Sequence, residues 1–408
     1  MSGPAPTGGP APDGTVPDWL PLRDDLRGLS AYGAPQLDVP VRLNTNENPH
    51  PPSPALVAAL SRAVADVAGT LNRYPDREAA ALRTELAEFL TVESAADGQV
   101  LTPAQVWAAN GSNEVLQQIC QAFGGPGRIA LGFGPSYSMH RLIALGTNTG
   151  WEDAGRDADF RLDAEAAVAA VVRYRPSIVF LCSPNNPTGT ALALDLVQAV
   201  HDAAAGAVVV VDEAYAEFRH PGVRSAVTLL PGAPRLIVTR TMSKAFSLAG
   251  ARVGYLATAP EVIDALRLVR LPYHLSALTQ AAARTALAFR DELLGTVAAV
   301  REQRDRLLAE LPVLGCEVAP SDANFVFFSV PGSSAEIWQA LLDRGVLVRD
   351  VGIPGWLRVT AGLPEETDAF LRAMEDAVVS TAGRTAAADT STVQTSTATH
   401  DPVPEGTR

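Results

Sequence analysis

The chain has 408 residues, of which 47% are hydrophobic and 19% charged, so its composition supports a large buried core built as two or three packed units. These proportions exclude a wholly disordered, collagen-like or disulfide-scaffold protein. The formal net charge is −13, from 45 acidic and 32 basic residues, and a field of that sign disfavours general nucleic-acid binding.

The two ends of the chain are predicted to be disordered. Residues 1–17 are rich in Pro, Gly and Ala, and the sequence from about Ala382 is rich in Thr and Ser. Neither stretch can bury enough apolar surface to offset the entropy of ordering. We therefore expect a disordered start and N-terminal arm over 1–46, a large domain over 47–283, a small C-terminal domain over 284–380 and a disordered tail over 381–408.

Helical and strand patterns alternate through the large segment. Helical spacing covers 54–67 and 78–90, and further helices are expected near 114–123, 135–145, 164–173 and 192–204. Apolar runs of strand length lie at 106–109, 128–131, 178–182, 207–211, 235–239 and 252–256. Continuous apolar strands separated by helices predict an α/β fold, a three-layer α/β/α domain with a mostly parallel sheet.

The C-terminal third predicts a smaller α+β unit. Long helices rich in Ala, Leu and Arg are expected from about 278 to 311. Strand-like runs at 324–330, 346–348 and 357–360 then alternate with helices over 335–344 and 364–379.

Cysteine content and hydropathy indicate the compartment. Cys120, Cys182 and Cys316 are too few and too scattered for a disulfide framework or a metal site. No stretch approaches the ~20 apolar residues of a membrane span, and residues 1–17 lack a secretory signal pattern. We therefore expect a cytoplasmic protein with no metal and no membrane partner.

One basic residue differs from all the others. Of the 32 basic residues 31 are arginine, and Lys244 is the single lysine. Arginine can replace lysine in most surface roles, but it cannot lose its proton to become a nucleophilic amine. A chance survivor is one interpretation of Lys244, and a chemical role is the other.

Polar clusters follow several predicted strands, at the carboxyl ends where open α/β sheets bind ligands. Residues 110–113 (Asn-Gly-Ser-Asn) precede a helix, where free amides favour a phosphate or, alternatively, form an ordinary cap. Asn186 lies in an Asn-Pro-Thr-Gly turn. Asp212 ends a buried strand and needs a partner, for which arginine is the expected type.

The single lysine also follows a strand, and its neighbours favour the chemical interpretation. Thr241 and Ser243 precede Lys244, and Arg252 comes eight residues later. Burial and cationic neighbours lower a lysine pKa. Together with the phosphate-binding helix start, Asn186, Asp212 and a tyrosine, these are the groups that hold pyridoxal phosphate, whose aldehyde condenses with a lysine.

The motifs that carry these residues resemble the fold-type-I pyridoxal-phosphate aminotransferases over about residues 29–379. They are Asn186-Pro187-Thr188-Gly189, Asp212-x-x-Tyr215, and Ser243-Lys244 with Arg252. Within that family the sequence is similar to actinobacterial histidinol-phosphate aminotransferases, on YGAPQLD at 32–38, RLNTNENP at 42–49, NRYP at 72–75, TMSKAF at 241–246 and LRVT at 357–360. The resemblance implies an aspartate-aminotransferase-like fold.

The resemblance also implies roles around the cofactor. Lys244 would bond covalently to the aldehyde and move the proton, and Asp212 would pair with the pyridine nitrogen. Asn186 and Tyr215 would contact the ring oxygen. Tyr137 would stack on the ring, with a plain core aromatic as the alternative. The residues implied to hold the cofactor phosphate are Ser112, Asn113, Thr241, Ser243 and Arg252.

The implied substrates are L-histidinol phosphate and 2-oxoglutarate, which would give imidazole acetol phosphate and L-glutamate in histidine biosynthesis. Arg358, helped by Arg349, Tyr32 and Asn186, would bind the acidic end of each substrate, and a solvated strand end is the alternative for both arginines. Tyr74 would reach into the cofactor site of a neighbouring subunit, so a homodimer is expected.

Two residues depart from the family pattern and keep other functions open. His50 stands where an aromatic such as Tyr is commoner, and Ala31 where Pro is frequent, both near the arm expected to cover the substrate. An aromatic amino-acid aminotransferase or a decarboxylase similar to the threonine-phosphate enzyme is one alternative. A non-catalytic sensing module of a transcription regulator is another, although residues 1–17 are too short to supply a DNA-binding extension.

Overall fold

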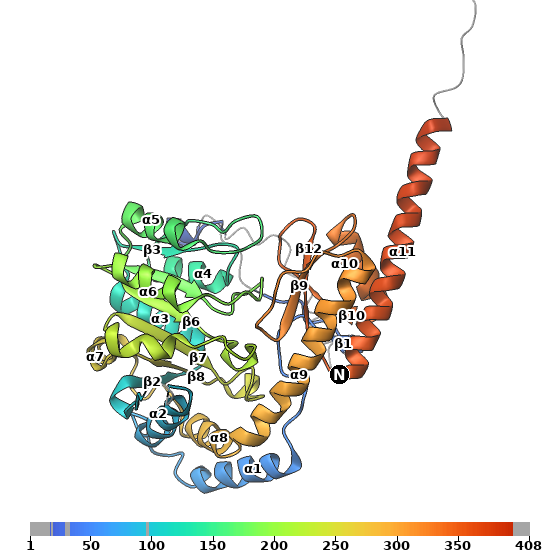
Figure 1. The fold of residues 1–408 in the computed structure, drawn as a ribbon. Coiled ribbons are helices and arrows are strands. Elements are labelled where there is room, and N and C mark those ends of the chain that lie inside the picture. The colour runs from blue at the N-terminus through green and yellow to red at the C-terminus, as the bar shows by residue number, and fades with distance from the viewer. Residues whose placement is uncertain (1–16, 18, 29–32, 95–97, 395–408) are drawn as a thin grey trace, which may run out of the picture.

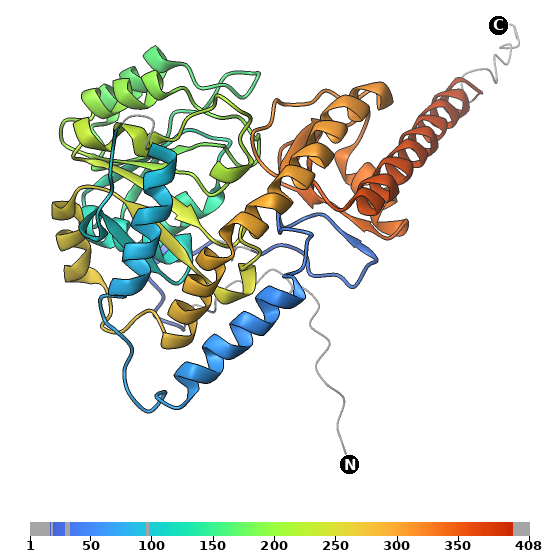
Figure 2. The ribbon, with the colours of Figure 1, turned by 60° about the horizontal axis from the view of Figure 1, so that its bottom comes forward.

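A computed structural model describes residues 17, 19–28, 33–94 and 98–394 of the chain, with side chains as far as residue 380 (Figure 1). The described part divides between a large mostly parallel sheet with its helices and a smaller sheet near the C-terminus. Helix α9 (Arg290–Glu310) runs from one to the other (Figures 1 and 2). No helix within these described ranges carries an apolar stretch long enough to cross a membrane.

The large sheet has seven strands in the order β2-β8-β7-β6-β5-β3-β4. Their bounds are β2 Val106–Ala109, β3 Ile129–Gly132, β4 Gly150–Asp153, β5 Ile178–Cys182, β6 Val208–Asp212, β7 Leu236–Thr241 and β8 Gly254–Ala257. Strand β8 is antiparallel to both neighbours, and the other pairings are parallel. Every residue of β5, β6, β7 and β8 is buried, as expected for strands covered on both faces.

Helices cover both faces of this sheet because successive strand residues point to opposite sides. In β6, Val209 and Val211 belong to the core shared with α2 (Ala80–Ser94), α5 (Ala164–Tyr174) and α6 (Leu194–Ala203). Val208 and Val210 pack on the other side, with the helices α3 (Ser112–Phe123), α4 (Ser138–Gly146) and α7 (Pro260–Val269). The predicted α/β class with a three-layer mostly parallel domain is confirmed.

The smaller sheet joins distant parts of the chain. Strand β12 (Trp356–Thr360) lies between β11 (Arg349–Asp350) and β9 (Phe325–Ser329), all antiparallel. Near the N-terminus, β1 (Val41–Arg42) pairs in parallel with β10 (Val346–Leu347). The segment after β1 therefore enters the space between the two sheets. The helices of this part are α10 (Ser334–Asp343) and α11 (Pro364–Gln394), and α1 (Pro54–Ala68) packs instead on α8 (Ala277–Ala288).

Short 3₁₀ turns complete the described elements: η1 Asp24–Leu26, η3 Pro103–Gln105, η4 Ala216–Phe218, η5 Ala226–Gly232, η6 Ala249–Ala251 and η7 Leu311–Leu314.

The elements differ from the sequence expectation in two places. Strand β4 carries no long apolar run, so its pattern did not predict it. Helix α11 continues to Gln394, past the point where a disordered tail was expected, because alanines at 386–388 have high helix propensity. The rest of the expected tail, from residue 395, and the expected disorder of residues 1–16 lie outside the described residues. The domain boundary at residue 284 stays a prediction.

Candidate functional site

A cavity of about 210 Å³ lies at the carboxyl ends of β5, β6 and β7, between the two sheets. The segment after β1 closes one side of it. Eleven predicted site residues line it: Ser112, Asn113, Tyr137, Asn186, Asp212, Tyr215, Thr241, Ser243, Lys244, Arg252 and Arg358. The fold therefore brings together at one cavity predicted site residues that are up to 246 positions apart in sequence (112 to 358).

Asp212, the last residue of β6, is 2% exposed and is held by two partners. Thr239 Oγ1 donates to its Oδ1 at 2.9 Å, and His140 Nε2 lies 2.9 Å from its Oδ2. His140 is itself buried and stacks on Phe180 at 4.7 Å. The expectation that an arginine would pair with Asp212 is wrong: a histidine and a threonine do so, and they hold the carboxylate at the cavity wall.

Arginine pairs instead with the next residue, on the opposite face of the sheet. Glu213 accepts from Arg240 Nε at 2.9 Å, and Arg240 also reaches Glu217 and Glu93 at 3.1 and 2.8 Å. Because neighbouring strand residues alternate between faces, Glu213 and Arg240 point away from the cavity while Asp212 and Thr241 face it. This buried ionic cluster joins β6, β7, η4 and α2 behind the site.

Lys244 has the properties of an activatable amine. Its Nζ donates to the carbonyl oxygen of Thr45 at 3.0 Å, so the segment after β1 fixes its direction. Burial, together with the positive charges of Arg358 and Arg252, lowers the pKa of Lys244 to about 8, against a smaller opposing effect of Glu47. A substantial fraction of this amine is therefore neutral, and nucleophilic, near neutral pH.

An anion-binding corner forms where α3 begins. Its first turn follows Gly111, whose φ is +82°, and a Cβ there would lie 2.6 Å from Arg252 Nη2, so only glycine lets the guanidinium approach. Thr241 Oγ1 and Ser243 Oγ lie 3.0 Å apart beside it, and Arg252 Nη1 reaches Ser243 Oγ at 3.4 Å. Amides at a helix start, two hydroxyls and a guanidinium suit a phosphate.

Tyr215, three residues after Asp212, also lines the cavity and is buried. Burial raises the pKa of Tyr215 to about 12, so its phenol keeps the proton at physiological pH. Asn186 Nδ2 lies 3.5 Å from the phenol oxygen, and Asn46 Nδ2 lies 3.0 Å from it. Asn46 is part of a motif that the sequence singled out, but no role was predicted for it.

Two arginines from the smaller sheet approach the cavity. Arg358 is 6% exposed and donates to Asn186 Oδ1 at 2.7 Å and to the carbonyl of Asn44 at 2.8 Å. Arg349, its antiparallel neighbour on β11, lines an adjoining hollow with Arg358, Asn186 and Tyr137. Its Nη2 donates to the carbonyl of Gly33 at 3.0 Å. These two guanidiniums make the outer end of the site attractive to anions.

Tyr137 also lies at the cavity, between the anion-binding corner and Asp212. Its hydroxyl donates to Asn113 Oδ1 at 3.2 Å, and its ring meets His140 edge-on, with centroids 5.4 Å apart. The ring is therefore held beside the space above Asp212.

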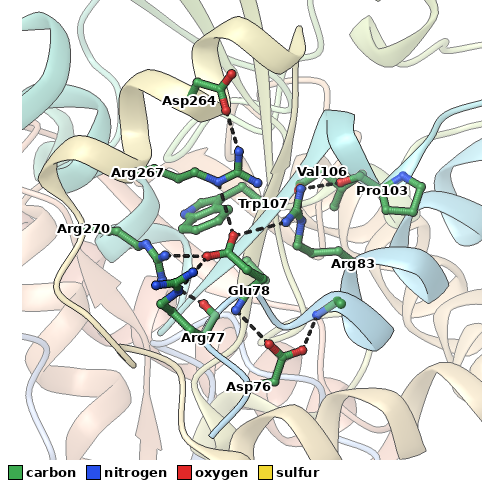
Figure 3. A network of polar contacts seen from close by, with 12 residues as sticks. Asp76, Arg77, Glu78, Arg83, Pro103, Val106, Trp107, Asp264, Arg267 and Arg270 are labelled. Atoms are coloured by element: carbon green, nitrogen blue, oxygen red, sulfur yellow. Dashed lines mark hydrogen bonds and ion pairs between the residues drawn. The ribbon is translucent and has the colours of Figure 1, made fainter.

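Tyr74 lies apart from this cavity, on the surface. It is 79% exposed and stacks on Tyr273 with ring centroids 4.3 Å apart. Its loop is anchored by Glu78, which accepts from Arg270 Nη2 at 2.6 Å and pairs with Arg267 at 3.2 Å (Figure 3). Burial alone would raise the pKa of Glu78, but these two guanidiniums hold it below its ordinary value. Tyr32, another predicted site residue, lies outside the described residues.

Two kinds of group contribute to the site without having been predicted from the sequence. His140 is a lone histidine within a helix, and nothing in its neighbourhood indicated a partner for Asp212. The carbonyls of Asn44 and Thr45 act through the backbone, which residue type does not reveal. Only the motif at 42–49 gave a signal for that segment.

The fold and the site together define the class of this protein. The family model described as aminotransferase class I and II matches residues 39–374, so the chain belongs to this family and is an aminotransferase. The class predicted from its motifs is thereby confirmed.

Individual relatives place the chain more narrowly. It is 66% identical over 360 residues to the histidinol-phosphate aminotransferase of Frankia casuarinae, covering 88% of this chain and 90% of that protein. It is 62% identical over 357 residues to the enzyme of the same name from Thermobifida fusca, covering 88% and 95%. Among solved structures, the histidinol-phosphate aminotransferase of Sinorhizobium meliloti in complex with pyridoxal-5'-phosphate matches with a TM-score of 0.75 and 27% identity, covering 84% of this chain and 92% of that one.

Proposed function

We propose that this chain is a pyridoxal-phosphate-dependent histidinol-phosphate aminotransferase, which exchanges an amino group between L-histidinol phosphate and 2-oxoglutarate. The observation that carries the proposal is the half-buried amine of Lys244, which shares one cavity with Asp212, a phosphate-binding corner and Arg358. The high identity to relatives of that name favours this substrate over aromatic amino acids or threonine phosphate.

The residues of the cavity fit the cofactor. When bound, pyridoxal phosphate supplies an aldehyde that takes up an amino group and a ring that withdraws electrons. The corner formed by Ser112, Arg252 and the Thr241–Ser243 hydroxyls would hold its phosphate, with Asn113 completing the helix start. The buried carboxylate of Asp212 would pair with the ring nitrogen, and the three binding regions converge on one cavity.

Further residues would place the ring between these ends. Tyr137 would cover one face of it, and Asn186 and Tyr215 would contact the ring oxygen. Lys244 would supply both the nucleophile and the base, because a neutral Nζ can take the proton from the substrate α-carbon and return it nearby. Its pKa near neutrality matches this double role.

Arg358 and Arg349 would bind the acidic ends of both substrates. A guanidinium fork accepts either a phosphate monoester or a carboxylate with paired hydrogen bonds. Arg358 is already oriented by Asn186 and by the carbonyl of Asn44, so it enters binding with little freedom to lose. The end of the cavity that carries the two arginines can thus bind the substrate of each half-reaction. Tyr32 is predicted to assist Arg358 in binding the acidic group.

A homodimer in the cytoplasm completes the proposal. Tyr74 does not line the cavity of its own chain, and its exposed ring stacks on Tyr273. Its loop is anchored by the contacts of Glu78 (Figure 3). Leu71, Leu268 and Leu271, which lie close in sequence to Tyr74 or to its partner Tyr273, are also exposed, at 51%, 86% and 74%. Exposed large apolar side chains are typical of a protein interface where they form a contiguous patch. Tyr74 would then complete the site of the second subunit.

A single-turnover donor panel tests the function. Holoenzyme is mixed with histidinol phosphate, phenylalanine, tyrosine or threonine phosphate, and conversion of the bound cofactor to its amine form is followed by absorbance. Histidinol phosphate should react fastest. Faster turnover with an aromatic amino acid would assign the aromatic function instead, and no turnover with any donor would indicate a sensing module. Lys244→Arg keeps the charge and serves as the inactive control.

A further inference from the structure

Asn46 has an unusual position for a residue with no predicted role. It is 1% exposed, its backbone takes the left-handed conformation with φ of 56°, and it lies between the two sheets. Asparagine adopts this conformation more readily than most residues. Asn324 Nδ2 donates to its carbonyl at 3.1 Å, which fixes the backbone further. Its side chain is thus presented to the cavity wall in one orientation.

Thr360 decides which way the amide of Asn46 faces. The Thr360 hydroxyl oxygen accepts the backbone N–H of Asn46 at 3.0 Å, and the same oxygen lies 3.0 Å from Asn46 Oδ1. If the amide were reversed, the Thr360 proton would have no acceptor among the described residues, and a buried donor without a partner is costly. The hydroxyl therefore donates to Oδ1, and Nδ2 faces Tyr215.

Asn186 reaches Tyr215 in an equally fixed orientation. Arg358 has only donors, so the atom of Asn186 that lies 2.7 Å from its Nη1 is the oxygen. The Nδ2 of Asn186 must then face the phenol, at 3.5 Å. Two amide N–H groups consequently point at the oxygen of Tyr215, one closely and one at longer range.

This arrangement determines what the phenol can do. A phenol oxygen accepts through its lone pairs and donates one proton. Asn46 and Asn186 approach the lone pairs, and no described residue accepts the proton of Tyr215. Its proton is therefore free to turn into the cavity that Tyr215 lines with Asp212 and Lys244.

We propose that Asn46, oriented by Thr360, is a positioning residue that keeps Tyr215 a hydrogen-bond donor toward the group bound in the cavity. The inference rests on the proposed cofactor function. It also ties the phenol to β12, because Thr360 stands two residues from Arg358 on that strand. Substrate binding at Arg358 and hydrogen bonding at Tyr215 thus share one strand.

The decisive experiment replaces the amide by a carboxylate of the same shape. In Asn46→Asp, an oxygen faces Tyr215 and attracts the phenol proton away from the cavity. Equilibrium binding of pyridoxal phosphate to the cofactor-free enzyme should weaken roughly tenfold, the effect of one hydrogen bond lost and reversed. In a Tyr215→Phe background the same substitution should change the dissociation constant less than about twofold, because the phenol it acts on is gone.

Two further variants guard against a general structural effect. Asn148→Asp makes the same change at an exposed asparagine with φ of 61°, and it should bind the cofactor like the wild type. Thr360→Val, which frees the amide of Asn46, should weaken binding, and Thr360→Ser should restore it. An equal loss from Asn46→Asp with and without the Tyr215 hydroxyl, or wild-type binding by Asn46→Asp, would overturn the inference. Failure of the wild type to bind pyridoxal phosphate would instead refute the proposed function.

Discussion

The reactivity of Lys244 offers a direct measure of the site's electrostatics. With a pKa of about 8, roughly a quarter of this amine is neutral at pH 7.5, whereas about one in a thousand exposed lysines of ordinary pKa is neutral there. In the cofactor-free enzyme, Lys244 should therefore react with an amine-acylating reagent roughly 200-fold faster than an exposed lysine would. This ratio is that of the two neutral fractions, and it applies to rates normalised for intrinsic nucleophilicity and for access to the reagent.

The assay is favoured by composition, because Lys244 is the single lysine of the chain. Trace labelling across pH 6–11, quantified on the peptide that contains Lys244 against a free-lysine standard, gives the titration midpoint. Removing a neighbouring charge tests the cause of the shift. Arg358→Met should raise the pKa and slow labelling at pH 7.5, whereas Glu47→Gln should lower it and speed labelling. A wild-type midpoint above pH 10, or shifts of the same sign in both variants, would refute the reasoning.

Three other changes probe other parts of the structure. Arg358→Ala should raise KM for both histidinol phosphate and 2-oxoglutarate by at least about tenfold in steady-state assays, and a change in only one of them would show that the two anions bind separately. Arg240→Met should lower the free energy of unfolding by about 3–5 kcal/mol in urea titrations, because it removes a buried cation that pairs with the carboxylates of Glu93, Glu213 and Glu217; a loss below about 1 kcal/mol would contradict this account. Gly254→Ala, whose Cβ would lie 2.1 Å from the Ser112 nitrogen, should weaken cofactor binding measured by equilibrium titration, with Gly250→Ala as a control in open space; equal binding by both variants would count against the tight corner.

Much of the fold followed from pattern because its strands are buried on both faces. Apolar runs such as that of β6 are visible in the sequence without knowledge of their neighbours, and the polar residue that ends or follows such a run is placed at the edge of the sheet. Asp212 and Lys244 could be placed at one edge on this basis alone. The half-exposed strand β4 gives no such signal, and its sequence Gly-Trp-Glu-Asp did not predict a strand.

Partnerships were harder to predict than positions. The need of Asp212 for a partner was clear from burial, but the identity of that partner depends on which residues of α4 and β7 face the same side. Arginine was the reasonable choice by residue type, and the chain does contain a buried arginine one strand away. The alternation of β7 turns Arg240 to the far face, which is a fact of three-dimensional register rather than of composition.

The segment after β1, which includes residues 44–46, has a consequence for how the enzyme is synthesised and folded. The carbonyl of Asn44 meets an arginine 314 positions later in the chain, and Thr360 holds Asn46 across the same span. A ribosome-bound chain that has emerged only as far as α8 already contains every strand of the large sheet. It still lacks Arg358, which would bind the substrate anion, and Thr360, which orients the amide of Asn46 toward Tyr215. Contacts of such sequence separation are slow to form. Competence for transamination is therefore expected only after translation has delivered β12.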